Sequence, residues 1–266
     1  STNVTAGLEG KVSNAIAMNV QAANPVVIDE TKAPKTIASG GTFDFSTIVS
    51  GGTGDGFNYA VTKQPAGAAG AITVAGVFTA GNMAGAYEVT VTDKSSGATK
   101  AYTVKEPFTV TPTKNNYKAS DGAQTFTAVG APSAAAYTWD IMDSATATTP
   151  VANPNDYGAW SNEQAPDART KTKDFTPNNA LTVQKTFYVR VTAADPGLVA
   201  DGLDKVAVGP FTILPVVPYK VVVTKATDNT PLAGAVVNGP NAIVNTNAQG
   251  EAAFNLPDGG TYTYQV

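Results

Sequence analysis

Residues 85–93 read GAYEVTVTD, and from Tyr87 onwards the apolar and polar side chains alternate. A period of two is typical of a β-strand that buries one face. Neighbouring runs are short and rich in aromatic, β-branched and Thr residues: residues 42–45, 57–61, 72–74, 77–79 and 99–105. Turn signals separate these runs, such as GGTGDG at residues 51–56. This spacing predicts a β-sandwich over residues 36–106.

Two of these runs carry a wider pattern. Residues 76–81 read GVFTAG, and the run at residues 85–93 supplies a Gly followed by VTVTD. The combination GxFTAG…G…VTVTD resembles the bacterial immunoglobulin-like repeats of surface adhesins. The resemblance covers roughly the first sandwich, and it implies an immunoglobulin-like fold and a place at the cell surface.

Strand patterns continue through a second domain, which we expect over residues 107–217. Its alternating runs lie at residues 125–129, 136–141, 187–193 and 206–213. Trp139, inside one of these runs, is predicted to be the core aromatic of an immunoglobulin-like sandwich. Residues 143–179 are polar and rich in Asn, Asp, Pro and Thr. A stretch of this length predicts an insertion that is either functional or loosely ordered.

The third domain, residues 218–266, carries the most specific motif. It contains PLAGA at residues 231–235, a Gly at position 250 and LPDGGTYTY at residues 256–264. In this order they resemble transthyretin-like modules, which occur as carboxypeptidase regulatory-like domains and as B-type domains of collagen adhesins and pilins. Such modules continue past the YT strand, so the resemblance implies that this domain lacks its last strand. An incomplete sandwich exposes an unpaired edge that a partner strand can fill.

Residues 1–35 form a separate N-terminal segment for which two structures are open. A helical spacing relates Leu8, Val12, Ala15, Ile16 and Asn19. A strand alternation relates Ile16, Met18 and Val20 instead. The next run, Val26, Val27 and Ile28, is predicted to be a short strand and is the candidate assembly strand.

Composition excludes several classes of function. The chain has no His and no Cys, which excludes Ser-His-Asp triads, Cys-His pairs and the usual zinc and copper sites. Its net charge is −4, and Arg occurs only at positions 169 and 190, so we expect no nucleic-acid partner. No apolar run is long enough to span a bilayer. We therefore expect a protein that is not an enzyme.

Two aromatic residues and one lysine are candidate functional residues. Tyr157 and Trp160 lie in the polar stretch, where they could contact a sugar or a protein partner, or could fix the stretch onto the sandwich. Lys225 lies where the collagen-adhesin domains place the lysine of an internal isopeptide bond. The buried acid that assists this reaction in that family would fall near Val266, which cannot serve. We therefore expect Lys225 to be a surface lysine.

Acidic residues in or near the polar stretch suggest one cofactor, Ca²⁺, bound by carboxylate and carbonyl oxygens at loops between sandwich domains. No EF-hand pattern and no dense Asp-x-Asp run is present, so solvated loop charge is the favoured interpretation. These acids are Asp140, Asp143, Asp156, Glu163, Asp167 and Asp174.

Together the patterns predict an all-β, non-enzymatic, extracellular or cell-surface structural protein. The first hypothesis is a fibre or pilus-like subunit that self-associates head to tail by β-strand addition. The second is a stalk or ligand-binding piece of a longer modular adhesin, with a host or carbohydrate ligand. The third is an accessory carbohydrate-binding module of a secreted hydrolase.

Overall fold

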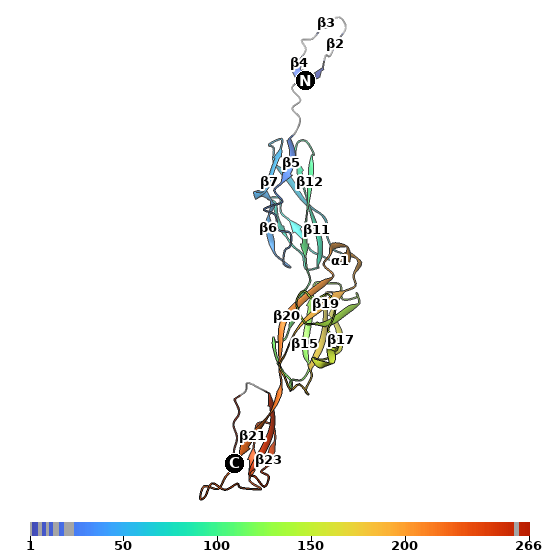
Figure 1. Ribbon diagram of the computed structural model, residues 1–266. Helices are drawn as coiled ribbons and strands as arrows, with labels where there is room; N and C mark the ends of the chain where they lie inside the picture. The colour runs from blue at the N-terminus through green and yellow to red at the C-terminus, as the bar shows by residue number, and fades with distance from the viewer. Residues whose placement is uncertain (1, 5–6, 9–10, 13–15, 19–23, 258–260) are drawn as a thin grey trace. The chain divides into compact units, whose positions relative to one another are not determined.

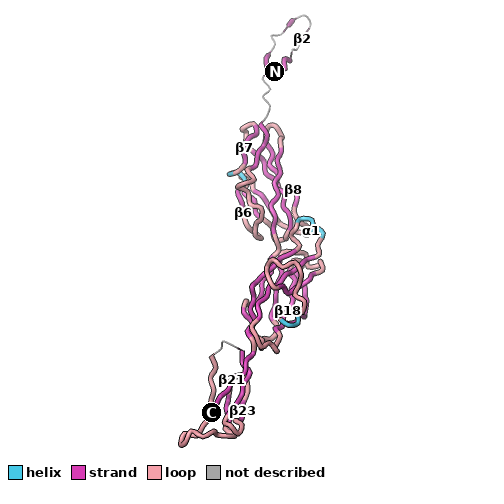
Figure 2. The backbone as a smooth tube through the Cα atoms, viewed as in Figure 1, coloured by secondary structure: helices cyan, strands magenta, loops and turns pink. Residues whose placement is uncertain are grey.

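The computed structural model describes residues 2–4, 7–8, 11–12, 16–18, 24–257 and 261–266. Nearly all regular structure in this part of the chain is β (Figures 1 and 2). The helical elements described are one short α-helix and two 3₁₀ turns: α1 (Pro196–Asp201), η1 (Phe45–Thr47) and η2 (Pro154–Asp156). None of the described helices is long and apolar enough to cross a membrane. The chain divides into two compact units, residues 1–82 with 86–106 and residues 83–85 with 107–266.

The described N-terminal residues are strands. β1 (Thr2–Val4) pairs antiparallel with β4 (Ile16–Met18), and β2 (Gly7–Leu8) pairs with β3 (Lys11–Val12). The helical alternative is therefore wrong for these residues, whereas Ala15, Asn19 and Val20 lie outside the described residues. Val4 is the register partner of Ile16, and β-branched residue types favour strands over helices.

The first sandwich is built from eight strands around an aromatic core. Phe45, Phe78, Tyr87, Val89 and Val91 are fully buried, so the alternation of residues 85–93 points inward as predicted. Its ladders are β5 (Asn24–Ile28) with β7 (Val49–Gly52); β6 (Thr42–Asp44), β10 (Val77–Thr79) and β9 (Ala71–Ile72); and β12 (Thr99–Glu106), β11 (Gly85–Asp93) and β8 (Phe57–Lys63).

Strand β5 extends the first sandwich beyond its expected boundary. Val26 and Ile28 are 6% and 4% exposed and belong to the same core as Phe45 and Phe78. The first sandwich therefore includes Asn24–Ile28, which precede the boundary predicted at residue 36. The apolar run at residues 26–28 was correctly predicted as a strand, but its sheet partner, β7, lies in a stretch that reads as a Gly-rich turn.

The second sandwich has two four-stranded sheets. One contains β13 (Thr109–Pro112), β15 (Gln124–Val129), β18 (Thr170–Pro177) and β17 (Gly158–Asp167). The other contains β14 (Asn116–Lys118), β20 (Lys205–Leu214), β19 (Lys185–Ala193) and β16 (Tyr137–Met142). Trp139 is 6% exposed in the core, which confirms its predicted role.

The polar stretch at residues 143–179 is not a loosely ordered insertion. It contains β17 and β18, which form half of the first of these sheets. Inward positions of β18 include Lys171 and Lys173, whose register partners on β15, Ala128 and Phe126, are buried. Because lysines occupy these inward positions, β18 does not show the alternation of apolar and polar residues that predicts a strand. Both lysine ammonium groups form ion pairs with Glu163.

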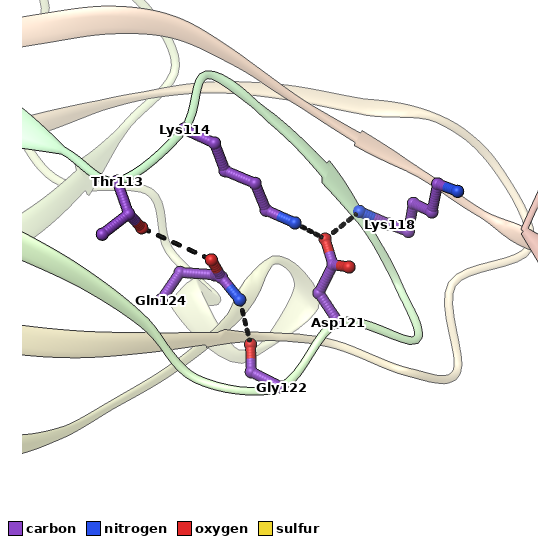
Figure 3. A network of polar contacts seen from close by, with 6 residues as sticks. All are labelled: Thr113, Lys114, Lys118, Asp121, Gly122 and Gln124. Carbon is purple, nitrogen blue, oxygen red and sulfur yellow. Dashed lines mark hydrogen bonds and ion pairs between the residues drawn. The ribbon is translucent and has the colours of Figure 1, made fainter.

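A polar network holds the loops on either side of β14 (Figure 3). Asp121 accepts hydrogen bonds from the Lys114 ammonium and from the backbone N–H of Lys118, the latter at 2.6 Å. Gln124 accepts from the Thr113 hydroxyl and donates to the Gly122 carbonyl. The network fixes both ends of β14, which runs parallel to β20.

The third module contains two two-stranded sheets. β21 (Val216–Val222) pairs with β24 (Glu251–Pro257), and β22 (Val236–Asn238) pairs with β23 (Ile243–Asn245). Its buried core consists of Val223, Val237, Ala252, Phe254 and Leu256. Residues 261–266 contribute a single bridge, Asn238 to Gln265, where the resemblance implied the YT strand.

Candidate functional site: open strands at the third module

Every described strand of the third module is an edge strand of its sheet. Each of its two ladders joins only two strands, so one edge of each strand has no full partner strand in the described part of the chain. On β22 that edge is partly covered by the bridge to Gln265, and just beyond β21 Thr224 bridges Pro231. Among the described strands, β23 pairs only with β22. Open N–H and C=O groups on such an edge are a template for another strand.

Apolar side chains are exposed beside these open edges. Ile243 on β23 is 68% exposed and Val236 on β22 is 56% exposed. The register places Val236 opposite Asn245 and Ile243 opposite Asn238, so the two apolar residues share the outer face of the β22–β23 ladder. A strand added to β23 would bring side chains next to Ile243 on this face.

The core of the third module is small. Among the described residues it has five buried apolar ones, compared with eleven in the first sandwich and twenty in the second. Tyr262 packs partly buried against this core with Tyr219, their ring centroids 5.5 Å apart, and Tyr264 packs against Phe254 at 5.1 Å. A domain with so little buried area gains stability from any additional packed strand.

The N-terminal hairpin, formed by β1 to β4, contains strands that belong to no larger sheet in the described part of the chain. Among the described residues, β1 pairs only with β4 and β2 only with β3, and none joins a sheet of either sandwich. An isolated two-stranded ribbon is marginally stable in water. By contrast, the candidate assembly strand Val26, Val27 and Ile28 is already used, since β5 is paired with β7 and two of its side chains are in the core. Residues 26–28 therefore belong to the first sandwich of their own chain.

The structure directs Tyr157 and Trp160 toward the core of the second sandwich. The Trp160 ring lies 5.2 Å from Phe175 and 5.3 Å from Phe126, measured between ring centroids. The Tyr157 ring lies 6.0 Å from Phe187, and the Lys185 ammonium lies 5.3 Å from its centroid. Both aromatic residues are half-buried and hold β17 and η2 against the sandwich, which is the second role the sequence allowed.

Lys225 is exposed, and its backbone N–H donates to the Thr230 carbonyl at 2.9 Å. Four of the six acids, Asp140, Glu163, Asp167 and Asp174, have separate partners rather than a shared centre. Asp140 pairs with Arg190 at 2.8 Å, and Asp174 accepts from the Thr125 hydroxyl at 2.7 Å. The described residues contain no group of three or more His, Cys, Asp or Glu that could hold a metal ion. Calcium binding stays a prediction from the sequence.

No protein-family model matches the chain, and no curated protein matches it significantly. Solved structures align with low scores. An endo-fucoidan hydrolase of glycoside hydrolase family 107 is 14% identical over 80% of this chain and 33% of its own, with a TM-score of 0.26. The eight N-terminal immunoglobulin domains of the Down syndrome cell adhesion molecule are 9% identical over 98% and 38%, with a TM-score of 0.28.

The major pilin subunit of Bacillus cereus is 7% identical over 91% of each chain, with a TM-score of 0.28. This chain spans 33% and 38% of the length of the hydrolase and the adhesion molecule. All three TM-scores are below 0.5, so these alignments carry no functional argument. The assignment to tandem immunoglobulin-like sandwiches rests on the strand ladders and cores described above.

Proposed function

We propose that this chain is a non-enzymatic structural protein of the cell surface, a fibre subunit that assembles head to tail by β-strand addition. The observation that carries the proposal is the open β23 edge of the third module, with Ile243 exposed beside it. The occupant is a strand of the N-terminal hairpin of a second copy. An added strand gains affinity from main-chain hydrogen bonds and specificity from alternate side chains.

The donor and the acceptor are different surfaces of the same chain. Contacts between different surfaces are heterologous, and they generate an open filament unless the rotation between subunits closes a ring. In the donor, β4 has Ile16 and Met18 two positions apart, the spacing of residues on one face of a strand. The two sandwiches, each with its own core, would act as folded spacers between successive joints.

Two complementary variants test the proposal. Deleting residues 1–23 removes the donor and leaves β5 intact. Ile243→Lys places a charge on the acceptor. We expect filaments of the wild-type chain in negative-stain electron microscopy and only monomers of either variant alone. Because each variant retains one half of the joint, an equimolar mixture should form 1:1 heterodimers in light scattering after size exclusion.

Val74→Lys is the matched control, since Val74 is 96% exposed in the first sandwich and lies outside the proposed joint. This variant should form filaments like the wild type. Filaments that persist after deletion of residues 1–23, or a wild-type chain that remains monomeric at high concentration, would overturn the proposal. A monomer would favour the stalk of a longer adhesin.

A further inference from the structure

A hollow of about 320 Å³ lies in the second sandwich, where β17 begins and β18 ends. Its lining comes from η2, the first residues of β17 and the residues that follow β18. The lining includes Asn155, Gly158, Thr176, Pro177, Asn178 and Asn179. None of the described residues that line the hollow is charged.

The walls of the hollow are joined by one side chain. The Asn178 amide nitrogen donates to the Asn155 carbonyl at 3.0 Å, and its oxygen accepts from the Ala180 N–H at 2.9 Å. The Asn178 backbone N–H also donates to the Tyr157 carbonyl at 2.9 Å. These bonds tie η2 to the end of β18. The hollow is therefore preformed, which lowers the entropy cost of binding a ligand.

Gly158 brings the two strands unusually close at the base of this hollow. A Cβ atom at this position would lie 2.3 Å from the Thr176 carbonyl oxygen and 2.6 Å from the Phe175 ring. Only a residue without a side chain allows this approach of β17 to β18. The close packing fixes the backbone at Gly158 and Thr176, two residues that line the hollow.

The remaining polar groups define the ligand chemistry. Asn155 and Asn179 are exposed, and in the described part of the chain neither side-chain amide makes a hydrogen bond. Each amide offers two donors and an acceptor, a set that matches the alternating donor and acceptor character of sugar hydroxyls. Phosphates and carboxylates prefer Arg or Lys, and hard cations prefer carboxylates. The uncharged lining disfavours both.

From this arrangement we infer that the second sandwich binds one residue of a neutral carbohydrate in the hollow between η2 and the ends of β17 and β18. The volume lies at the lower end of the range of small-molecule pockets, about 300–1,000 Å³. The site is distinct from Tyr157 and Trp160, whose rings face the core. It goes beyond fibre assembly, because it would give every subunit a carbohydrate contact.

The test is a titration of the ¹⁵N-labelled full chain with glucose, galactose, mannose and N-acetylglucosamine, followed by NMR. We expect at least one sugar to produce saturable shifts at the Gly158 backbone amide and at the Asn155 and Asn179 side-chain amides. Asn155→Ala and Asn179→Ala should each weaken this binding by about tenfold, the loss expected for one net hydrogen bond.

Asn116→Ala is the matched control, since Asn116 is an exposed Asn of the same sandwich on β14. It should leave the affinity unchanged. The inference is overturned if none of the four sugars produces saturable shifts, or if binding survives both pocket variants. Far-UV circular dichroism of each variant separates loss of binding from loss of fold, and Asn179→Asp, which keeps the shape and adds a charge, should also bind more weakly.

Discussion

At the scale of single residues, Asp93 joins two turns of the first sandwich. It is 1% exposed and accepts hydrogen bonds from the backbone N–H of Thr53 at 2.9 Å and of Ser96 at 2.7 Å, and from both hydroxyls. These hydrogen bonds hold the pKa of Asp93 well below its usual value of 3.8, and the bond from the Thr53 N–H has the largest effect. The ionised form is therefore the one that the fold stabilises.

We predict that Asp93→Ala destabilises the first sandwich at pH 7, because it leaves two inward N–H groups without their acceptor. A depressed pKa contributes stability that is present above pH 3.8 and is lost as the pH falls through the folded-state value. Thermal unfolding of wild type and variant, compared at pH 7 and at pH 2, should therefore show a smaller difference at the lower pH. An equal or larger difference at pH 2 would contradict this role.

Glu106 shows the opposite behaviour. Its side chain is fully buried at the end of β12, and burial raises the pKa of its carboxyl above the usual 4.5, with Tyr87 and Ser39 acting in the other direction. A raised folded-state pKa means that stability is fully present below pH 4.5 and is lost as the pH rises through the folded-state value.

We therefore predict that Glu106→Gln, which keeps the shape and removes the charge, unfolds at higher temperature than the wild type at pH 8. The advantage should shrink as the pH is lowered and level off below pH 4.5, where both side chains are neutral. Calorimetry across this range measures the difference. Glu88→Gln, at a more exposed position on the neighbouring strand β11, is the control. A pH-independent difference would show that charge burial is not the cause.

At the scale of secondary structure, β17 is a structural strand that is anchored by Trp160. Because the Trp160 ring contacts Phe126, Phe175 and Trp139 in the core, its loss leaves a cavity rather than a vacant ligand site. We predict that Trp160→Ala lowers the free energy of unfolding of the second sandwich by about 3 kcal/mol. Urea unfolding monitored by the remaining Trp139 fluorescence measures the change.

Val183→Ala is the control for this prediction, since Val183 is 60% exposed in the same sandwich and its truncation should change the stability by less than about 0.5 kcal/mol. A Trp160→Ala protein as stable as the wild type would mean that the ring does not anchor β17. In that case a role in ligand contact would regain support.

The elements that the sequence predicted well are those with apolar residues at every second position. β11 and β19 have this pattern, and the core includes Tyr87, Val89, Phe187 and Val191. β18 was missed because inward lysines snorkel past the core edge to reach Glu163. Helix α1 was also missed, although the Asp195 cap, Pro196 and Gly202 at the C-cap are the usual signals. The helix has only six residues and buries only Leu198, so it has no repeating apolar pattern that would predict it.

The candidate site was predictable only in part. The third-domain motif indicated an open sandwich, and in the described part of the chain all four strands of the third module are edge strands. No run in the sequence indicated one of them, β23. β22 and β23 form a local hairpin, but the cover of its outer edges depends on residues elsewhere in the chain, such as Gln265, so the exposed edge could not be located from local patterns. The hollow at Asn155 and Asn179 was not predicted because residues 143–179 read as an insertion, whereas its walls meet where β17 pairs with β18.

At the scale of the whole molecule, the proposed assembly links the stability of the third module to the N-terminal segment of another copy. Binding to the folded form alone stabilises it by RT ln(1 + [L]/Kd), which is about 2.7 kcal/mol when the ligand is at 100 times its Kd. A synthetic peptide of residues 1–23, added to the chain that lacks those residues, should therefore protect the third module. The small core makes the effect large relative to the stability of the module itself.

We predict that this peptide slows hydrogen exchange of the backbone amides of β22 and β23 and leaves exchange in the cores of both sandwiches unchanged. The protection should saturate with peptide concentration, because it reflects a single strand added at one edge. A peptide with the same composition in scrambled order is the control, since it changes which side chains share a face of the added strand. Equal protection by the scrambled peptide would indicate non-specific edge pairing, and protection spread over all three cores would place the donor elsewhere.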